Sequence, residues 1–271
     1  MVDANFAFLY ATPSLNGWMI AVVLNTVLAA IAWIVPKKLL TTSGLIHAWA
    51  LGILIWGCLG WQGYTVVMFY FLMGSAVTKV GIAQKEAEGI AEKRSGARGP
   101  ENVWGSAFTA ALCALGIWVC SVFFASPSTD LIMRLLALGY VASFSTKLAD
   151  TCASEIGKAY GKRTFLITTL QPVSRGTEGA VSLEGTVAGI VASVAIALVG
   201  WAVGLITPGG IVICIIAAFI ATNIESVIGA TLQTQIEWLS NELVNVANTL
   251  IGAIAAIAIA IAVQNLGFLV L

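Results

Sequence analysis

Long uncharged apolar runs constrain this chain more than any other feature. The segments Gly17 to Val35 and Val246 to Val263 each hold at least 18 residues without one charged side chain. About 20 apolar residues in a helix cross the roughly 30 Å hydrocarbon core of a bilayer. We therefore expect transmembrane helices, and an integral membrane protein with the lipid bilayer as its immediate partner.

The rest of the chain has the same character, with 59% hydrophobic and only 10% charged residues. An ordinary soluble domain carries about 25% charged residues. The first 16 residues lack the basic region and cleavage site of a signal peptide, so we interpret the first run as an uncleaved span. Hydrophobic runs predict an all-α, polytopic membrane helix bundle in a single transmembrane domain, 1–271. The expected spans, about eight, are 17–35, 44–60, 63–80, 104–125, 130–149, 185–206, 209–231 and 246–269.

Basic residues alternate with the spans. Two lysines follow the first span, five Lys or Arg lie around the loop after the third, and five lie from Lys147 to Arg175, with Arg134 as the exception. The positive-inside rule then places loops at about 81–103, 150–184 and 232–245 in the cytoplasm and both termini on the opposite side. Eleven of the 13 acidic residues share the cytoplasmic side. Because orientation needs only basic residues, this mixture indicates a site, although long loops also carry solvated charges.

Cysteine and histidine give little chemistry here. The cysteines are scattered singly, without a CxxC pair, so we expect neither a zinc site nor a disulfide framework. His47 is the only histidine, and no serine or cysteine motif accompanies it. We interpret the cysteines as small packing residues and give His47 no catalytic role.

A first polar cluster runs from Lys147 to Lys158. At about 100° per residue, Lys147, Asp150 and Ser154 share one side of a helix, whereas apolar residues take the opposite side. The acidic pair Asp150 and Glu155 suits Mg²⁺, which binds one or two carboxylates and leaves its other positions to water and phosphate. The alternative is an interfacial helix stabilised by charge pairs four residues apart.

Two further polar clusters follow. The glycine-rich stretch from Gly161 to Thr186 can present backbone N–H groups to phosphate, or form only a turn, and it is not a Walker A loop. Polar stripes at 222–233 and 241–249 enter the membrane together. Intramembrane Glu and Asn are energetically costly, so they indicate a site or pathway, with interhelical hydrogen bonding as the alternative.

Four motifs stand in a fixed order: Asp150 to Gly157, Gly176 to Thr186, Glu225 to Thr231 and Asn241 to Thr249. In this order they resemble the phytyl-phosphate kinase family of plants and cyanobacteria, which acts in phytol salvage and vitamin E (tocopherol) synthesis. With matches in the preceding loop, the resemblance covers roughly residues 70–252. This chain departs from the family at Glu225-Ser226, where other members have Asp-Ser.

The resemblance implies transfer of the γ-phosphoryl group of CTP, or another nucleotide, to phytyl phosphate, with Mg²⁺ as the expected cofactor. It implies catalytic roles for Asp150, Glu155, Lys158 and Arg175. Phosphate or nucleotide contacts are expected from Lys79, Arg98, Ser154, Lys162, Gly176, Thr177, Gly179 and Ser182. Metal contacts are expected from Asp150, Glu155, Glu225 and Asn223, and acceptor contacts from Asn241, Glu242, Asn245 and Asn248. If so, Asp150, Arg175 and Asn241 should line one cavity.

Other functions stay open at the level of sequence. Polar stripes inside apolar helices also describe a transporter, although the outer half of this chain lacks a matching polar route. A CTP-dependent polyprenol kinase or cytidylyltransferase would use similar acidic, basic and glycine-rich motifs. The expected location is a cyanobacterial plasma or thylakoid membrane. A homo-oligomer is compatible with the sequence, and no nucleic-acid partner is expected.

Overall fold

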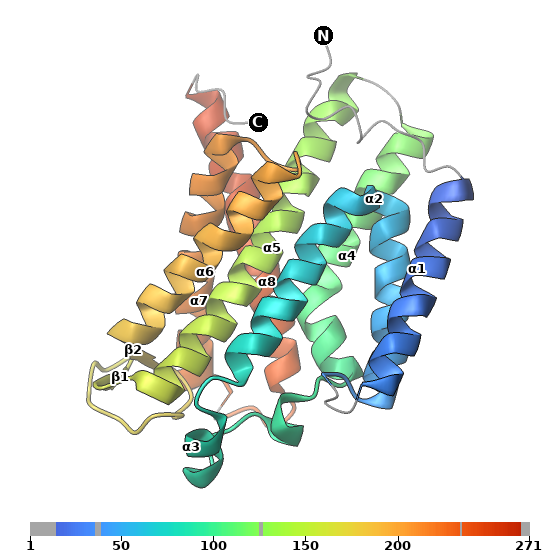
Figure 1. Cartoon of the computed structure of the whole chain (residues 1–271). Coiled ribbons are helices and arrows are strands. Elements are labelled where there is room, and N and C mark those ends of the chain that lie inside the picture. The colour runs from blue at the N-terminus through green and yellow to red at the C-terminus, as the bar shows by residue number, and fades with distance from the viewer. Residues whose placement is uncertain (1–14, 36–38, 125–126, 234, 267–271) are drawn as a thin grey trace.

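The computed structural model describes residues 15–35, 39–124, 127–233 and 235–266, and it is a bundle of helices (Figure 1). Seven helices of the described part are long and apolar enough to cross a membrane. This confirms the expected all-α membrane bundle. The long helices are α1 (Leu15–Ile34), α2 (Thr42–Thr78), α4 (Pro100–Phe123), α5 (Pro127–Tyr160), α6 (Leu183–Ala202), α7 (Pro208–Thr231) and α8 (Asn241–Asn265).

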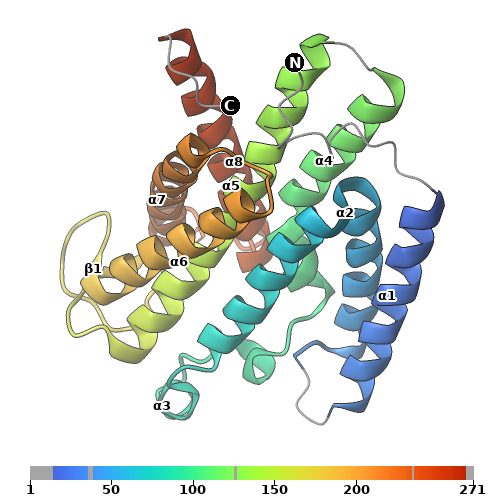
Figure 2. The same ribbon diagram turned by 45° about the horizontal axis from the view of Figure 1, so that its top comes forward.

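Helix α2 is a hairpin of two helical legs. Gly60 interrupts it with φ 61° and ψ −157°, a backbone conformation that glycine adopts without a Cβ penalty. Trp56 and Tyr64 have ring centroids only 5.2 Å apart, although eight residues of straight helix would rise about 12 Å. Figure 2 shows the chain folding back at this point. The two spans expected at 44–60 and 63–80 therefore exist as the legs of α2.

Helix α5 lies at the centre. It packs against α2, α4, α6, α7 and α8, and 72% of its most apolar stretch is buried, compared with 11% for α1. Gly185 and Gly189 of α6 lie against the α5 backbone at Ala153 and Ala149, where a Cβ would meet carbonyl oxygens. These small residues let the backbones of α5 and α6 approach closely.

The polar end of the bundle, as we call it here, carries the connections 79–99, 161–182 and 232–240. It includes the short helix α3 (Ile82–Ala87), a 3₁₀ turn at Lys93–Gly96 and a two-stranded antiparallel sheet, β1 (Thr164–Leu166) with β2 (Ala180–Ser182). Figure 1 shows α3 and both strands at this end, whereas α1 begins and α8 ends at the opposite one. The sheet was not expected from the sequence.

Helix α5 continues past its expected span, 130–149, as one unbroken helix to Tyr160. The amphipathic segment that begins at Lys147 is therefore the last part of a membrane helix. Its polar side faces the neighbouring helices, and Lys147 and Glu155 are buried there. The predicted polar cluster thus becomes one wall of an internal site.

Candidate phosphate and metal site

A cavity of about 730 Å³ opens at the polar end of the bundle. Its walls come from α2, α4, α5, α7, α8, the start of α6 and the connections 79–99 and 161–182. The expected site residues that line it are Arg98, Asp150, Ser154, Glu155, Lys158, Gly176, Thr177, Gly179, Ser182, Glu225, Asn241, Glu242 and Asn245. Lys147, which belongs to the first polar cluster but has no predicted role in the site, lines the cavity as well.

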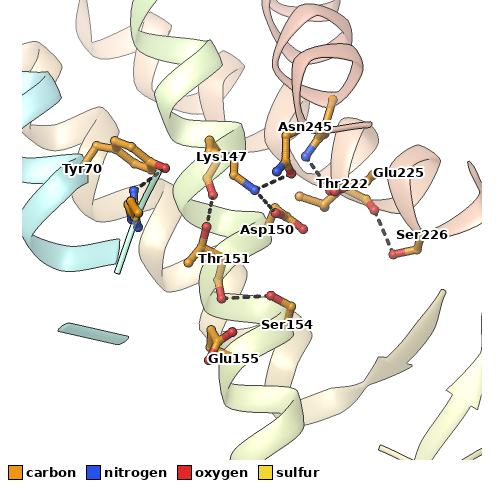
Figure 3. Close-up of polar contacts among 12 residues, drawn as sticks. Tyr70, Lys147, Asp150, Thr151, Ser154, Glu155, Thr222, Glu225, Ser226 and Asn245 are labelled. Carbon is orange, nitrogen blue, oxygen red and sulfur yellow. Dashed lines mark hydrogen bonds and ion pairs between the residues drawn. The ribbon is translucent and has the colours of Figure 1, made fainter. Parts of the chain in front are cut away.

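Lys147 connects two helices at the inner end of this cavity. Its Nζ lies 2.5 Å from Asp150 Oδ2 on the same helix and donates to Asn245 Oδ1 of α8 at 2.6 Å (Figure 3). Only 9% of the Lys147 side chain is exposed, so its ammonium depends on these two oxygens. The polar sides of α5 and α8, expected to form separate clusters, meet here.

Glu225 adds a second carboxylate from α7. Asn248 of α8 donates to its Oε2 at 2.5 Å, and Figure 3 shows the Glu225 side chain beside Asp150. Asn248 is buried beneath the cavity wall, and its Oδ1 accepts no hydrogen bond from the residues described. Three helices therefore bring carboxylate and amide oxygens to one point.

This donor set fits Mg²⁺. Asp150 and Glu225 offer carboxylate oxygens and Asn245 offers its side-chain Oδ1, and magnesium prefers such oxygen ligands. Within the described ranges no group of three or more His, Cys, Asp or Glu residues gathers around one point. Two carboxylates suffice, however, where substrate phosphates and waters complete the octahedral coordination.

Glu155 has a different environment from the one expected of a metal ligand. Its Oε2 accepts from the ammonium of Lys85, and Oε1 lies 3.9 Å from Lys158 Nζ. Lys85, on α3, is fully buried and also donates to the Thr78 carbonyl at 2.8 Å. The pair therefore fastens the connection 79–99 to α5. Sequence reasoning missed Lys85, because a lysine in a loop between spans is usually solvated.

Arg98 is the best-placed guanidinium of the cavity. Its Nη1 donates to the Tyr70 hydroxyl at 2.9 Å, and its Cζ lies 5.2 Å from the centre of that ring. The backbone of Arg98 is fixed by a bridge to Leu40. Arg98 lines the cavity, and among the described residues no carboxylate forms an ion pair with it, so its charge is available to an anion there. Tyr70, missed from the sequence, lies in an apolar run that carries no motif.

The glycine-rich connection packs over one side of the cavity. Gly176 has φ 82° and approaches Ile90, while Gly179, with φ 76°, lies against the α7 backbone at Ser226. Ser182 caps α6 by accepting from the Gly185 N–H at 3.1 Å. These residues line the cavity, but their closest contacts explain the fold of the connection.

Five expected site residues do not line the cavity. Arg175 pairs with Glu88 at 2.6 Å and donates to the Ala159 carbonyl, so the expected wall of Asp150, Arg175 and Asn241 lacks its arginine. Asn223 bonds to the Phe219 carbonyl of its own helix. The remaining three are Lys79 and Lys162, which are exposed, and Asn248, which is buried.

The fold and this cavity define a polytopic helical membrane protein with a phosphate- and cation-compatible site at one end. The chain belongs to the family described as integral membrane protein DUF92, whose model matches residues 25–253. It is 64% identical over 242 residues to an uncharacterised membrane protein of Synechocystis, covering 89% of this chain and 91% of that one. It is 45% identical over 259 residues to the chloroplast protein VTE6 of Arabidopsis thaliana, covering 95% and 75%. No solved structure matches.

Proposed function

We propose that this protein is a prenyl-phosphate kinase. It would transfer the γ-phosphoryl group of a nucleoside triphosphate, with CTP as the first candidate, to an isoprenoid monophosphate such as phytyl phosphate. The observation that carries this proposal is the convergence of Asp150 and Glu225 with the cations of Lys147, Lys158 and Arg98 in one cavity. The match to VTE6 covers all four motifs that resemble phytyl-phosphate kinases.

Phosphoryl transfer needs positioning and charge stabilisation more than covalent help from the protein. Asp150 and Glu225, with the side-chain Oδ1 of Asn245, would hold Mg²⁺. When bound, this ion would stabilise the negative charge of the phosphate oxygens. Arg98 and Lys158 face the cavity from different walls and would bind phosphate oxygens from two directions. No general base is required, because the acceptor monophosphate is already an anion.

The place of the cavity suits a lipid substrate. An isoprenoid tail gains about 0.8 kcal/mol per CH₂ by staying in lipid, whereas phosphates and a nucleotide need water-accessible space. A site at the polar end of a membrane bundle serves both needs. We propose that this end faces the cytoplasm, in the plasma or thylakoid membrane of a cyanobacterium.

A transporter is the alternative from another class. The cavity lining reaches no farther than Ser106 along α4 and Asn245 along α8, which lie within the first two turns of those helices. A route across the membrane would continue along both helices. The geometry therefore favours chemistry at one face over passage through the bundle.

The test is an assay of the purified protein in detergent with phytyl phosphate, Mg²⁺ and each nucleoside triphosphate in turn. We expect phytyl diphosphate and a nucleoside diphosphate in equal amounts. Release of pyrophosphate would identify a cytidylyltransferase instead. Absence of a prenyl diphosphate with every nucleotide, from protein that remains folded, would refute the proposal.

A further inference from the structure

The carboxylate site already contains a cation from the chain itself. Lys147 Nζ lies 2.5 Å from Asp150 Oδ2 and 2.6 Å from Asn245 Oδ1, and Glu225 stands beside Asp150. Two of the oxygens that would bind a divalent ion are therefore engaged by an ammonium. Since like charges repel strongly in a poorly solvated site, Mg²⁺ and this ammonium cannot both hold the same two oxygens.

The cavity offers the Lys147 ammonium other positions besides the one beside Asp150. It lines the cavity together with Arg98 and Lys158, and its flexible four-carbon stem can place the ammonium in more than one position. A triphosphate in the cavity would offer acceptor oxygens of higher charge than a single carboxylate. The ammonium can then exchange a carboxylate partner for a phosphate partner without becoming unpaired in a buried site.

We propose that Lys147 is a displaceable counter-cation of the metal site, and that it leaves Asp150 and Asn245 for the phosphates of the nucleotide when the divalent ion binds. This rests on the proposed function for the identity of the phosphate ligand, but not for the exchange itself. Before a divalent ion binds, the Lys147 ammonium offsets one of the two negative charges that Asp150 and Glu225 bring to the site. Metal binding without nucleotide is then weak, so that the ion and the nucleotide bind together.

The exchange makes a prediction for metal binding alone. Replacing Lys147 by Gln removes the competing charge but keeps an amide that can donate to Asp150. Without nucleotide, Mn²⁺ as a probe for Mg²⁺ should bind Lys147→Gln about tenfold more tightly than wild type, a size typical of coupling between two binding events. Lys158→Gln is the matched control, because it removes an equal charge from the same cavity beside Glu155 rather than Asp150.

The measurement is Mn²⁺ titration followed by electron paramagnetic resonance, on purified protein shown to be folded by size exclusion and thermal melting. If Lys147→Gln does not fold, Lys147→Met, of similar length, takes its place. Unchanged or weaker Mn²⁺ binding in the Lys147 variant overturns the exchange, as does an equal gain in Lys158→Gln. If wild type makes no prenyl diphosphate while the Mn²⁺ pattern holds, the kinase proposal fails and the exchange stands.

Discussion

Lys85 and Glu155, 70 residues apart in the sequence, form an ion pair in which both side chains are buried. Lys85 comes from the six-residue helix α3, and Glu155 comes from the central helix α5. The pair holds the connection that carries Arg98 against the helix that carries Asp150. The pair therefore helps to position Arg98 relative to Asp150, together with the backbone bridge between Arg98 and Leu40.

Lys85→Met should destabilise the protein by about 3–5 kcal/mol, because removing one partner leaves a buried charge without its counter-ion. The double variant Lys85→Met/Glu155→Met should recover a large part of the loss. Apparent melting temperatures in detergent would measure both. Lys79→Met is the control: it alters an exposed lysine of the same connection, so its effect should stay within about 0.5 kcal/mol. Equal melting of Lys85→Met and Lys79→Met would contradict the role of the pair.

Asp150→Asn should lower kinase turnover about a hundredfold or more while the protein remains folded, because the lost charge stabilises the transition state rather than the packing. Asn223→Ala is the control, because Asn223, like Asp150, is a metal ligand expected from the sequence. Asn223 bonds within its own helix and does not line the cavity, so its turnover should stay close to wild type. Initial rates at saturating substrate would separate the two, and a fully active Asp150→Asn would remove Asp150 from the site.

The two arginines expected at the phosphates should behave differently. Arg98→Ala should lower kcat/KM about tenfold or more, since a charge-assisted hydrogen bond to phosphate contributes about 1.5–3 kcal/mol. Arg175→Ala removes a partly exposed pair with Glu88 outside the cavity and should change kcat/KM little. The reverse order of effects would place the phosphates at the glycine-rich connection.

Topology can be tested by labelling single cysteines introduced into a cysteine-free variant. Positions 98 and 175 should react from the cytoplasmic side and position 61 from the other, as the basic residues require. Trp61 follows Gly60 at the bend of α2, and its side chain is 54% exposed. Reaction of positions 61 and 98 from the same side would contradict the hairpin.

Much of the fold is readable from the sequence because membrane spans are a strong pattern. The bend at Gly60 falls between two expected spans, and the alternation of basic loops requires it. The end of α5 is not readable in the same way, because polar residues from Lys147 onward indicate an exit from the membrane. Helices α7 and α8 supply partners there, so the helix continues.

The site is only partly predictable for a related reason. A motif predicts which residue types gather, but not which of two neighbouring charges faces the cavity. Arg98 and Arg175 both follow polar stretches, and only contacts with Tyr70 and Glu88 distinguish them. Lys85 and Tyr70 take their roles from packing between distant segments, which no local pattern records.

The most direct test of the central claim follows the phosphorus atom. Purified protein would be incubated with Mg²⁺, phytyl phosphate and CTP carrying ³²P at its γ position, and the position of the label in the product would be determined. We expect the label in the terminal phosphate of phytyl diphosphate, with unlabelled CDP released, and transfer by Asp150→Asn at a rate lower by about a hundredfold or more. Label that remains in CTP, or leaves as pyrophosphate or inorganic phosphate without a labelled lipid product, would contradict the account.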